Sequence, residues 1–299
     1  SRIVSPTCSS SFRRGANVCA STNVPETNNN NKKKKLPTPQ KRRDVLIGLS
    51  GASLLSHAPY SLSSIEQQQQ QQPLTDIGEL GLGCWSWGNS FVWGYEESMD
   101  DELQRVFNLA VDRGVRLFDS ADSYGKDGRS EQLLGKFIRE YPGDDAKKND
   151  IILATKFAPY PWRVTSSSFV NAAKESAKRF GKEKIDLGQL HWSTGNYQPL
   201  QEGALWSGIA DAYEEGIIGA VGLSNYGPRQ LQKIHKYMSS RGVKISTLQV
   251  QYHLLSRFPE LNGTKETCDE LGIKLIAYSP LALGLLTGKY SVENPPPGL

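Results

Sequence analysis

Short apolar runs alternate with amphipathic segments from about Gly78 onward. Seven runs have the length of buried strands, and they cover residues 81–85, 115–119, 151–156, 187–191, 220–224, 248–252 and 274–278. Between them, apolar residues recur at three- and four-residue intervals, which predicts helices over 99–112, 130–140, 166–180, 200–215, 228–241 and 260–271. Glycines at 181, 216, 242 and 272 follow four of these segments, in the position that favours the end of a helix.

The spacing of the runs predicts an α/β fold built from repeated strand–helix units. From the second run to the seventh, the strand ends lie 26 to 37 residues apart. Because the runs are almost continuously apolar, they favour a parallel sheet that is covered on both faces. A doubly wound open sheet and a closed (β/α)₈ TIM barrel both satisfy this pattern.

Polar residues at the strand ends favour the barrel. Asp119, Lys156 and His191 stand at the ends of the second, third and fourth runs. In a barrel the carboxyl ends of all strands converge on one mouth, where catalysis takes place. Burying such groups without partners costs several kcal/mol, so we expect them to pair and form a functional site. The first run leads into Ser86-Trp87-Gly88, not into a glycine-rich turn that opens a helix, which disfavours the dinucleotide-binding doubly wound fold.

The segments around these residues resemble the aldo-keto reductase family. The resemblance rests on Phe118–Gly125, Gly128–Glu131 with Leu134-Gly135, Thr155-Lys156, Leu190–Trp192, Gly222–Asn225 and Tyr278–Leu281, and it extends over about residues 77–291. The sequences of Trp85–Asn89 and Leu190–Thr194 are most similar to those of plant chloroplast members. The resemblance implies a TIM barrel, NADPH as the cofactor, and reduction of an aldehyde or ketone to an alcohol, with pyridoxal-like compounds among the substrates.

The resemblance also implies a catalytic tetrad of Asp119, Tyr124, Lys156 and His191, and the chemistry of these side chains agrees with it. A free Tyr has a pKa near ~10, so Tyr124 is protonated and can donate a proton. We expect Lys156 to stabilise the phenolate and lower the pKa of Tyr124 by ~1–3 units. Asp119 would hold Lys156, and His191 would hydrogen-bond the substrate carbonyl. We expect Asp122 to brace the loop and not to act as a second acid.

Several further residues are expected to contact the cofactor or the substrate. By resemblance, Ser224, Asn225 and Gln249 hold the nicotinamide carboxamide and Tyr278 stacks on its ring. A second reading of Gln249 is a polar residue in the strand interior. Ser279, Leu281 and Gly284 are expected near the pyrophosphate, and Trp85 is placed among the cofactor contacts. The residues expected to form a substrate-pocket wall are Trp85, Trp93 and Trp192.

The first part of the chain has the composition of a targeting sequence. Residues 1–43 hold ten Lys and Arg against one acid, which leaves 25 basic and 30 acidic side chains in residues 44–299. A Ser- and Arg-rich, acid-poor start predicts a chloroplast transit peptide, with residues 1–76 forming this leader and a low-complexity linker. Arg42-Arg43 leaves a thylakoid-lumen signal open beside the stroma. The segment from 44 to 65 is too rich in Ser to span a membrane.

Other functions are less compatible with the sequence. The basic charge is confined to the leader, so a nucleic-acid partner is disfavoured. The four cysteines indicate neither a disulfide framework nor a zinc site, and no metal is expected. Two alternatives stay open: a non-catalytic, cofactor-binding regulatory barrel, and an inactive truncated gene product. Residues 77–299, 223 in number, are fewer than the ~250 of a typical barrel, so we expect about seven βα units and an incomplete carboxyl end. Oligomeric state and substrate identity are left open.

Overall fold

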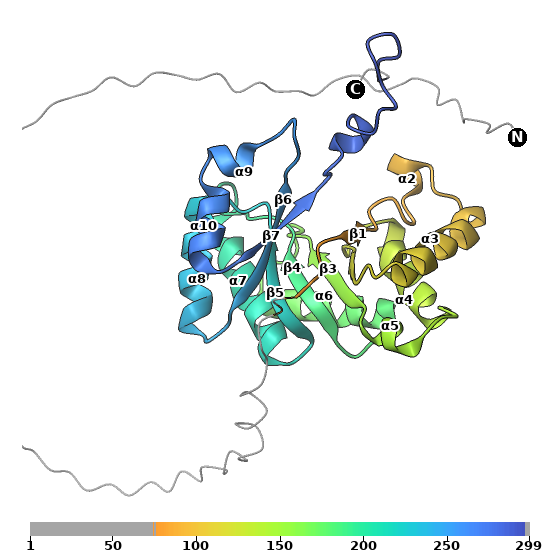
Figure 1. Cartoon of the computed structure of the whole chain (residues 1–299). Coiled ribbons are helices and arrows are strands. Elements are labelled where there is room, and N and C mark those ends of the chain that lie inside the picture. Colours follow the sequence, from red (N-terminus) through yellow and green to blue (C-terminus); the bar gives the residue numbers. More distant parts are fainter. Residues whose placement is uncertain (1–73, 75, 297–299) are drawn as a thin grey trace, which may run out of the picture. The chain divides into compact units, whose positions relative to one another are not determined.

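A computed structural model describes residue 74 and residues 76–296 (Figure 1). The predicted leader, including Arg42-Arg43, Cys8 and Cys19, lies outside the described residues apart from its last few positions. Within the described part, no helix has the length and apolar character needed to cross a bilayer.

The described strands and helices alternate along the chain. The strands are β1 (Gly81–Gly83), β2 (Leu117–Asp119), β3 (Ile152–Phe157), β4 (Ile185–Leu190), β5 (Ile218–Ser224), β6 (Ile245–Gln251) and β7 (Lys274–Tyr278). The helices are α2 (Ser90–Trp93), α3 (Asp100–Asp112), α4 (Arg129–Arg139), α5 (Asp145–Asn149), α6 (Ser166–Phe180), α7 (Pro199–Glu214), α8 (Pro228–Ser240), α9 (Phe258–Leu261) and α10 (Thr264–Leu271). Short 3₁₀ turns lie at Glu97–Met99, Lys126–Gly128 and Ala282–Gly284.

The strands form one parallel sheet in the order of the sequence, β1 to β7. A doubly wound sheet reverses its strand order at a switch point, so the unbroken order confirms the predicted barrel. The helices lie around the outside of the curved sheet (Figure 1). Within the described part of the chain, β1 pairs with β2 alone and β7 with β6 alone. The barrel is therefore nearly closed, with two unpaired strand edges.

Most predicted elements are confirmed to within a few residues. The helix predicted over 166–180 has those bounds, begins at the capping side chain of Thr165, and ends at Gly181, whose φ of 67° is the left-handed conformation that favours glycine. The strands β4, β5 and β6 start two or three residues earlier than predicted. The short helices α2 and α5 were not predicted, and the segment 260–271 is divided between α9 and α10.

Two apolar clusters hold the barrel together. The larger one lies between sheet and helices and includes Phe107, Phe118 and Phe137, each 0% exposed. The smaller one contains Leu117, Ile152, Ala154, Leu187 and Ala220. On β2 and β3 these residues alternate with those of the larger cluster, so they face the barrel interior.

The chain just before β1 closes the base of the interior cluster. Ile77 is 3% exposed within this cluster, and Leu74 packs beside it. Asp76 forms a 2.7 Å ion pair with Arg116, which in turn contacts Asp150. Leu74, Asp76 and Ile77 therefore pack as part of the barrel.

Candidate active site

The predicted tetrad comes together at the carboxyl ends of β2, β3 and β4. Asp119 is the last residue of β2, Lys156 lies one residue before the end of β3, and His191 follows β4 directly. Tyr124 lies on the loop between β2 and α4. Because the strands are parallel and adjacent, their ends bring these side chains to one edge of the sheet.

Lys156 and Asp119 form a buried ion pair. Lys156 is 1% exposed; its Nζ donates to Asp119 Oδ2 at 2.6 Å and to the Ser120 carbonyl at 2.6 Å. Burial lowers the pKa of Lys156, but the attraction of Asp119 and Tyr124 outweighs it, so the pKa lies above its ordinary value. The lysine is therefore a fixed cation at neutral pH.

Tyr124 lies against this cation. The Nζ of Lys156 is 4.7 Å from the centre of the Tyr124 ring. Burial raises the pKa of Tyr124, and the opposing charge of Lys156 does not cancel that rise. The expected net lowering of this pKa was therefore wrong, because desolvation of the phenolate outweighs the lysine. The phenol remains protonated well beyond neutral pH.

His191 is a neutral imidazole next to Tyr124. The two ring centres are 5.8 Å apart. Burial, followed by the charge of Lys156, lowers the pKa of His191 to about 3. Its Nδ1 is buried and has no hydrogen-bond partner among the described residues. A neutral ring of this kind can hydrogen-bond an uncharged oxygen without competing with Lys156 for negative charge.

Asp122 braces the loop, as predicted. Its Oδ1 accepts from the Ala158 amide at 3.1 Å, and its Oδ2 accepts from Arg163 at 2.5 Å. Burial raises its pKa in spite of Arg163. Both carboxylate oxygens are engaged in tying the loop after β2 to the loop after β3.

A buried hydroxyl pair connects the strand ends that carry the tetrad. Ser130 Oγ donates to the Cys84 carbonyl at 2.9 Å and accepts from Ser120 Oγ at 2.9 Å. Its backbone amide donates to the Tyr124 carbonyl at 3.3 Å. The end of β1, the end of β2 and the tyrosine loop are thereby held by one residue of α4.

Two further buried residues contact the tetrad or its strand and were missed in the sequence. Gln189 Nε2 donates to Asp119 Oδ1 at 2.8 Å. Glu131 accepts from Thr155 Oγ1, next to Lys156, at 2.5 Å and pairs with Arg179 at 2.5 Å. Gln189 could have been found from its position two residues before His191 and two after Leu187. Alternate residues of a strand share one face, so Gln189 faces the barrel interior together with Leu187. Glu131 was noticed only as part of a motif.

The residues expected to hold the nicotinamide also lie together. Asn225 follows β5 and donates from Nδ2 to Ser224 Oγ and to the His191 carbonyl, each at 3.1 Å. Its Oδ1 accepts from Tyr278 OH at 3.0 Å, and its backbone amide donates to the Gln249 carbonyl at 2.9 Å. Gln249 is 4% exposed in the interior of β6. Hydroxyl, amide and aromatic groups therefore gather beside the tetrad.

The other predicted contacts lie around the mouth. Ser279, with φ of 51°, and Gly284, with φ of 98°, belong to a turn after β7 in which Leu281 is exposed. Trp85 packs edge-to-face on Trp93, with 5.2 Å between the ring centres, and its ring centre lies 6.4 Å from that of Tyr124. The ring centres of Trp192 and His191 are 4.6 Å apart. A row of aromatic rings thus runs through pairwise contacts from Trp93 and Trp85 to Tyr124, His191 and Trp192.

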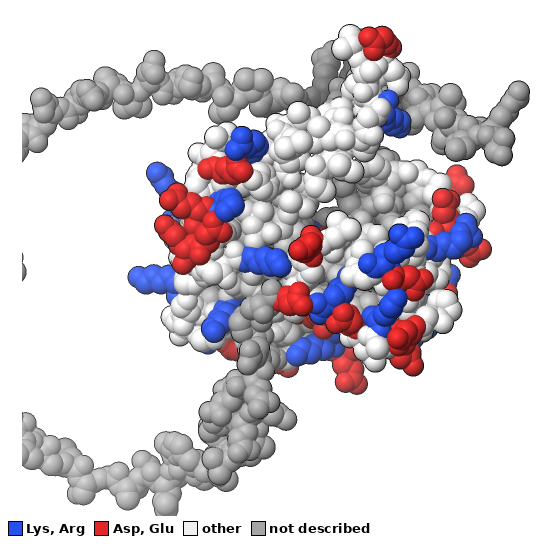
Figure 2. All heavy atoms as spheres, in the orientation of Figure 1, with Lys and Arg blue, Asp and Glu red and all other residues white. Residues whose placement is uncertain are grey.

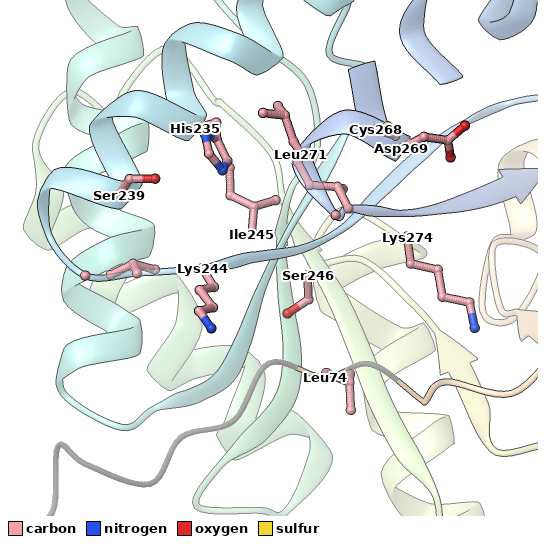
Figure 3. A pocket seen from close by; sticks show the side chains of 14 residues that line it. Leu74, His235, Ser239, Lys244, Ile245, Ser246, Cys268, Asp269, Leu271 and Lys274 are labelled. Carbon is pink, nitrogen blue, oxygen red and sulfur yellow. The ribbon is translucent and has the colours of Figure 1, made fainter. Parts of the chain in front are cut away.

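A cavity of about 820 Å³ lies away from this mouth (Figure 3). It is lined by the residues that begin β6 and β7, including Ile245 and Lys274, and by Leu74. Its other lining residues come from α8, from α10 and from the turns that lead into β6 and β7, at the strand ends opposite to those that carry the tetrad. The visible charged surface mixes both signs, with acidic side chains gathered over α10 beside basic ones (Figure 2).

The chain aligns in sequence with known proteins over most of its length. The chain is 53% identical to the chloroplastic pyridoxal reductase of Arabidopsis thaliana, an alignment that covers 78% of this chain and 64% of the relative. It is 31% identical to the L-glyceraldehyde 3-phosphate reductase of Escherichia coli K12, over 71% of this chain and 60% of that protein. The chain thus spans less than two thirds of the length of these relatives.

Solved structures give the same fold. A thermostable aldo-keto reductase, Tm1743, crystallised with the inhibitor epalrestat, superposes with a TM-score of 0.60 at 28% identity, covering 71% of this chain and 72% of the other. The holo form of an aldo-keto reductase from Bacillus halodurans gives a TM-score of 0.58 at 27% identity, covering 73% and 67%. The model of the aldo/keto reductase family matches residues 79–298. With the parallel barrel and the grouped strand-end residues, this match shows that the chain belongs to the aldo/keto reductase family.

Proposed function

We propose that this protein is an NADPH-dependent carbonyl reductase, which converts an aldehyde or ketone into an alcohol. The observation that carries the proposal is the buried pair of Lys156 and Asp119 beneath Tyr124. A buried ammonium against a phenol has a clear chemical use, because it stabilises the phenolate that remains after the phenol gives up its proton.

Each tetrad residue has a distinct task in this proposal. Bound NADPH would supply the hydride. Tyr124 donates its proton to the substrate oxygen, and Lys156 stabilises the charge that develops on the phenol. Asp119 keeps the ammonium in place. His191, neutral because burial lowers its pKa to about 3, hydrogen-bonds the substrate oxygen and orients the carbonyl.

The residue types beside the tetrad fit a nicotinamide. Asn225 and Gln249 can donate to and accept from a carboxamide, and Ser224 adds a hydroxyl. The ring of Tyr278 offers a planar surface at the end of β7. NADP was present with acetate in the structure of an aldo/keto reductase from Klebsiella pneumoniae whose fold matches this chain with a TM-score of 0.58, at 24% identity. We propose that NADPH binds at the mouth of the barrel beside the tetrad, with Ser279, Leu281, Gly284 and Trp85 as further contacts.

The aromatic row supports a planar aromatic aldehyde as the substrate. Trp85 lies next to Tyr124 and Trp192 packs on His191, and both indoles are partly exposed. Rings of this kind pack well on another planar ring. Pyridoxal, the substrate in the name of the Arabidopsis relative, is a pyridine aldehyde with that shape.

Turnover with NADPH tests the proposal. We expect the purified chain to consume NADPH when an aromatic aldehyde such as pyridoxal is added, measured as loss of nicotinamide absorbance, with an aliphatic aldehyde as the comparison. Binding of NADPH without turnover of either aldehyde would favour the non-catalytic, cofactor-binding alternative. Turnover of aliphatic but not of aromatic aldehydes would keep the reductase and refute the aromatic substrate.

We also propose that residues 1–76 direct the protein to the chloroplast stroma. The acid-poor leader supports this, as does the chloroplastic relative. A fluorescent reporter behind residues 1–76 should enter chloroplasts and remain in the stroma. Changing Arg42 and Arg43 to Lys distinguishes the stroma from the thylakoid lumen, because a twin-arginine signal would be lost in that variant. An unaltered location of the reporter would support the stroma.

A further inference from the structure

Gln189 occupies the second oxygen of the carboxylate that holds Lys156. On adjacent strands Gln189 pairs in register with Lys156, and it is 0% exposed. Its Nε2 donates to Asp119 Oδ1 at 2.8 Å, while Lys156 donates to Asp119 Oδ2 at 2.6 Å. The two oxygens of one carboxylate are thereby divided between an ammonium and an amide.

This arrangement is costly for the fold. Gln189 Oε1 is buried and has no hydrogen-bond partner within the described part of the chain. An unsatisfied buried acceptor costs roughly 1–3 kcal/mol. Space for the amide comes from Gly222, where a Cβ atom would lie 2.8 Å from Gln189 Cγ. An apolar side chain would fill this place without that cost, so the value of Gln189 lies in its N–H donor.

We propose that Gln189 is a positioning residue for proton transfer. This role rests on the proposed reductase function. The Gln189 amide fixes the rotation of the Asp119 carboxylate, and the carboxylate in turn holds Lys156 against Tyr124. The ammonium has a second anchor at the Ser120 carbonyl. Without the amide, the carboxylate can turn about its Cβ–Cγ bond, and Lys156 then shifts relative to the Tyr124 ring.

Removing the donor while keeping an apolar side chain of similar length tests this idea. In Gln189→Leu we expect kcat to fall by about 10- to 100-fold, since small displacements of reacting groups have effects of this size, while the KM for NADPH hardly changes. Gln104→Leu, on α3, is the matched control. Gln104 Nε2 donates to Asn108 Oδ1 at 2.8 Å and to the Phe137 carbonyl of α4 at 3.1 Å, and its Oε1 is buried with no partner among the described residues. That variant should keep the parent kcat.

Gln189→Glu adds a readout that a purely structural role would not move. When protonated, the introduced carboxyl group can donate to Asp119 as the amide does; when ionised, it repels Asp119. A neighbouring carboxylate raises the pKa of such a group above its ordinary ~4.3. We therefore expect kcat near the parent value at low pH and a new decline as pH rises through the introduced pKa. Gln104→Glu should show no such decline.

The titratable groups that interact with Asp119 or Lys156, the two partners beside position 189, come from separate elements. They are Cys84 after β1, Asp119 on β2, Tyr124 on its loop, Lys156 on β3 and His191 after β4. Burial raises the pKa of Cys84 and Tyr124, and it lowers the pKa of His191 to about 3. None of these three pKa values moves toward the neutral range. A new decline of kcat in that range in Gln189→Glu therefore reports the introduced carboxyl group.

The Lys156 side chain gives a measurement that does not depend on turnover. In protein with ¹³C-labelled lysine, assigned by Lys156→Arg, the Cε signal of Lys156 should show an added inflection in Gln189→Glu at the pH of the kcat decline, and none in Gln104→Glu. A parent-like kcat and pH profile in both position-189 variants, or no inflection at Lys156, would overturn the inference. Absence of turnover in the parent would instead refute the proposed function, and the Lys156 signal would still decide the role of Gln189.

Discussion

At the scale of single residues, the site depends on balances between burial and charge. Lys156 stays a cation because Asp119 and Tyr124 outweigh its desolvation, whereas His191 has no such partner and burial makes it neutral. The same desolvation raises the pKa of Tyr124. One environment thus keeps an ammonium charged, an imidazole neutral and a phenol protonated.

Tyr124→Phe isolates the proton donor. The change removes one hydroxyl and keeps the ring, so we expect kcat to fall by ~10²–10⁴-fold, the usual range for general acid catalysis, with NADPH affinity almost unchanged. Tyr141→Phe is the control, because it also removes a hydrogen-bonded hydroxyl. Tyr141 lies in the loop after α4 and donates to Asp112 Oδ1 at the end of α3 at 2.6 Å. Steady-state kinetics measure both. A near-normal kcat in Tyr124→Phe would refute the assignment.

His191 gives a pH dependence of stability with a definite sign. Its pKa is about 3 in the folded protein and near ~6.5 in an unfolded chain. Below pH ~6.5 the unfolded state binds the proton first. The contribution of His191 to the free energy of unfolding is therefore present above that pH and is lost as pH falls toward about 3.

Urea unfolding of the parent and of His191→Asn measures this contribution. We expect the free energy of unfolding of the parent to fall by up to about 1.4 kcal/mol more per pH unit than that of the variant between pH ~6 and ~4. Parallel curves for the two proteins would show that the histidine is not held neutral.

At the scale of elements, close packing of α4 on α6 supports the strand ends. A Cβ atom at Gly135 would lie 2.4 Å from the Phe180 carbonyl oxygen, so these helices approach each other as closely as glycine allows. The same two helices carry Glu131 and Arg179, whose ion pair reaches Thr155 beside Lys156. Helix spacing and site geometry are therefore connected.

Two glycine substitutions test this packing. Gly135→Ala should destabilise the protein by about 1–3 kcal/mol, because the new methyl group forces the helices apart. Gly203→Ala, in α7 with no atom within 4 Å of the added Cβ, should stabilise it by roughly 0.5–1 kcal/mol through helix propensity. Thermal unfolding of both variants gives the comparison. Equal effects at the two positions would contradict a close contact at Gly135.

Much of the fold could be predicted from periodicity, because long apolar strands and amphipathic helices leave strong local patterns. The short helix α5 was not found because five polar-rich residues carry no apolar period. The tetrad followed from the strand ends and from the family resemblance. Gln189 could not be found this way, since its partner Asp119 lies 70 residues away and only the register of the sheet brings them together. The net pKa of Tyr124 likewise depends on burial that the local sequence does not display.

At the scale of the whole molecule, the described strands leave the backbone groups on one edge of β1 and one edge of β7 unpaired within the sheet. β7 is only partly buried along its length, whereas β3 is buried throughout. Unpaired backbone donors and acceptors on such an edge can pair with another chain. We expect a polypeptide of residues 1–299 to self-associate as its concentration rises.

A charge on the edge should reduce this association. Ala277 is exposed in the middle of β7, so Ala277→Lys places an ammonium where a second strand would dock. Ala277→Ser is the uncharged control. Sedimentation velocity over a range of concentrations should show less association for the Lys variant alone. A monomeric parent at all concentrations would mean that the edges are protected.

The sequential strand order also bears on how the chain is made. Each strand after β1 pairs with the strand that precedes it in sequence. Within the described barrel, a strand that arrives amino end first therefore meets a partner that is already present. Pairing of parallel strands is slow because the connecting segment must close first, so each new strand keeps an open edge until it docks on its predecessor. The barrel can thus grow from β1 toward β7 as the chain enters the compartment where it folds.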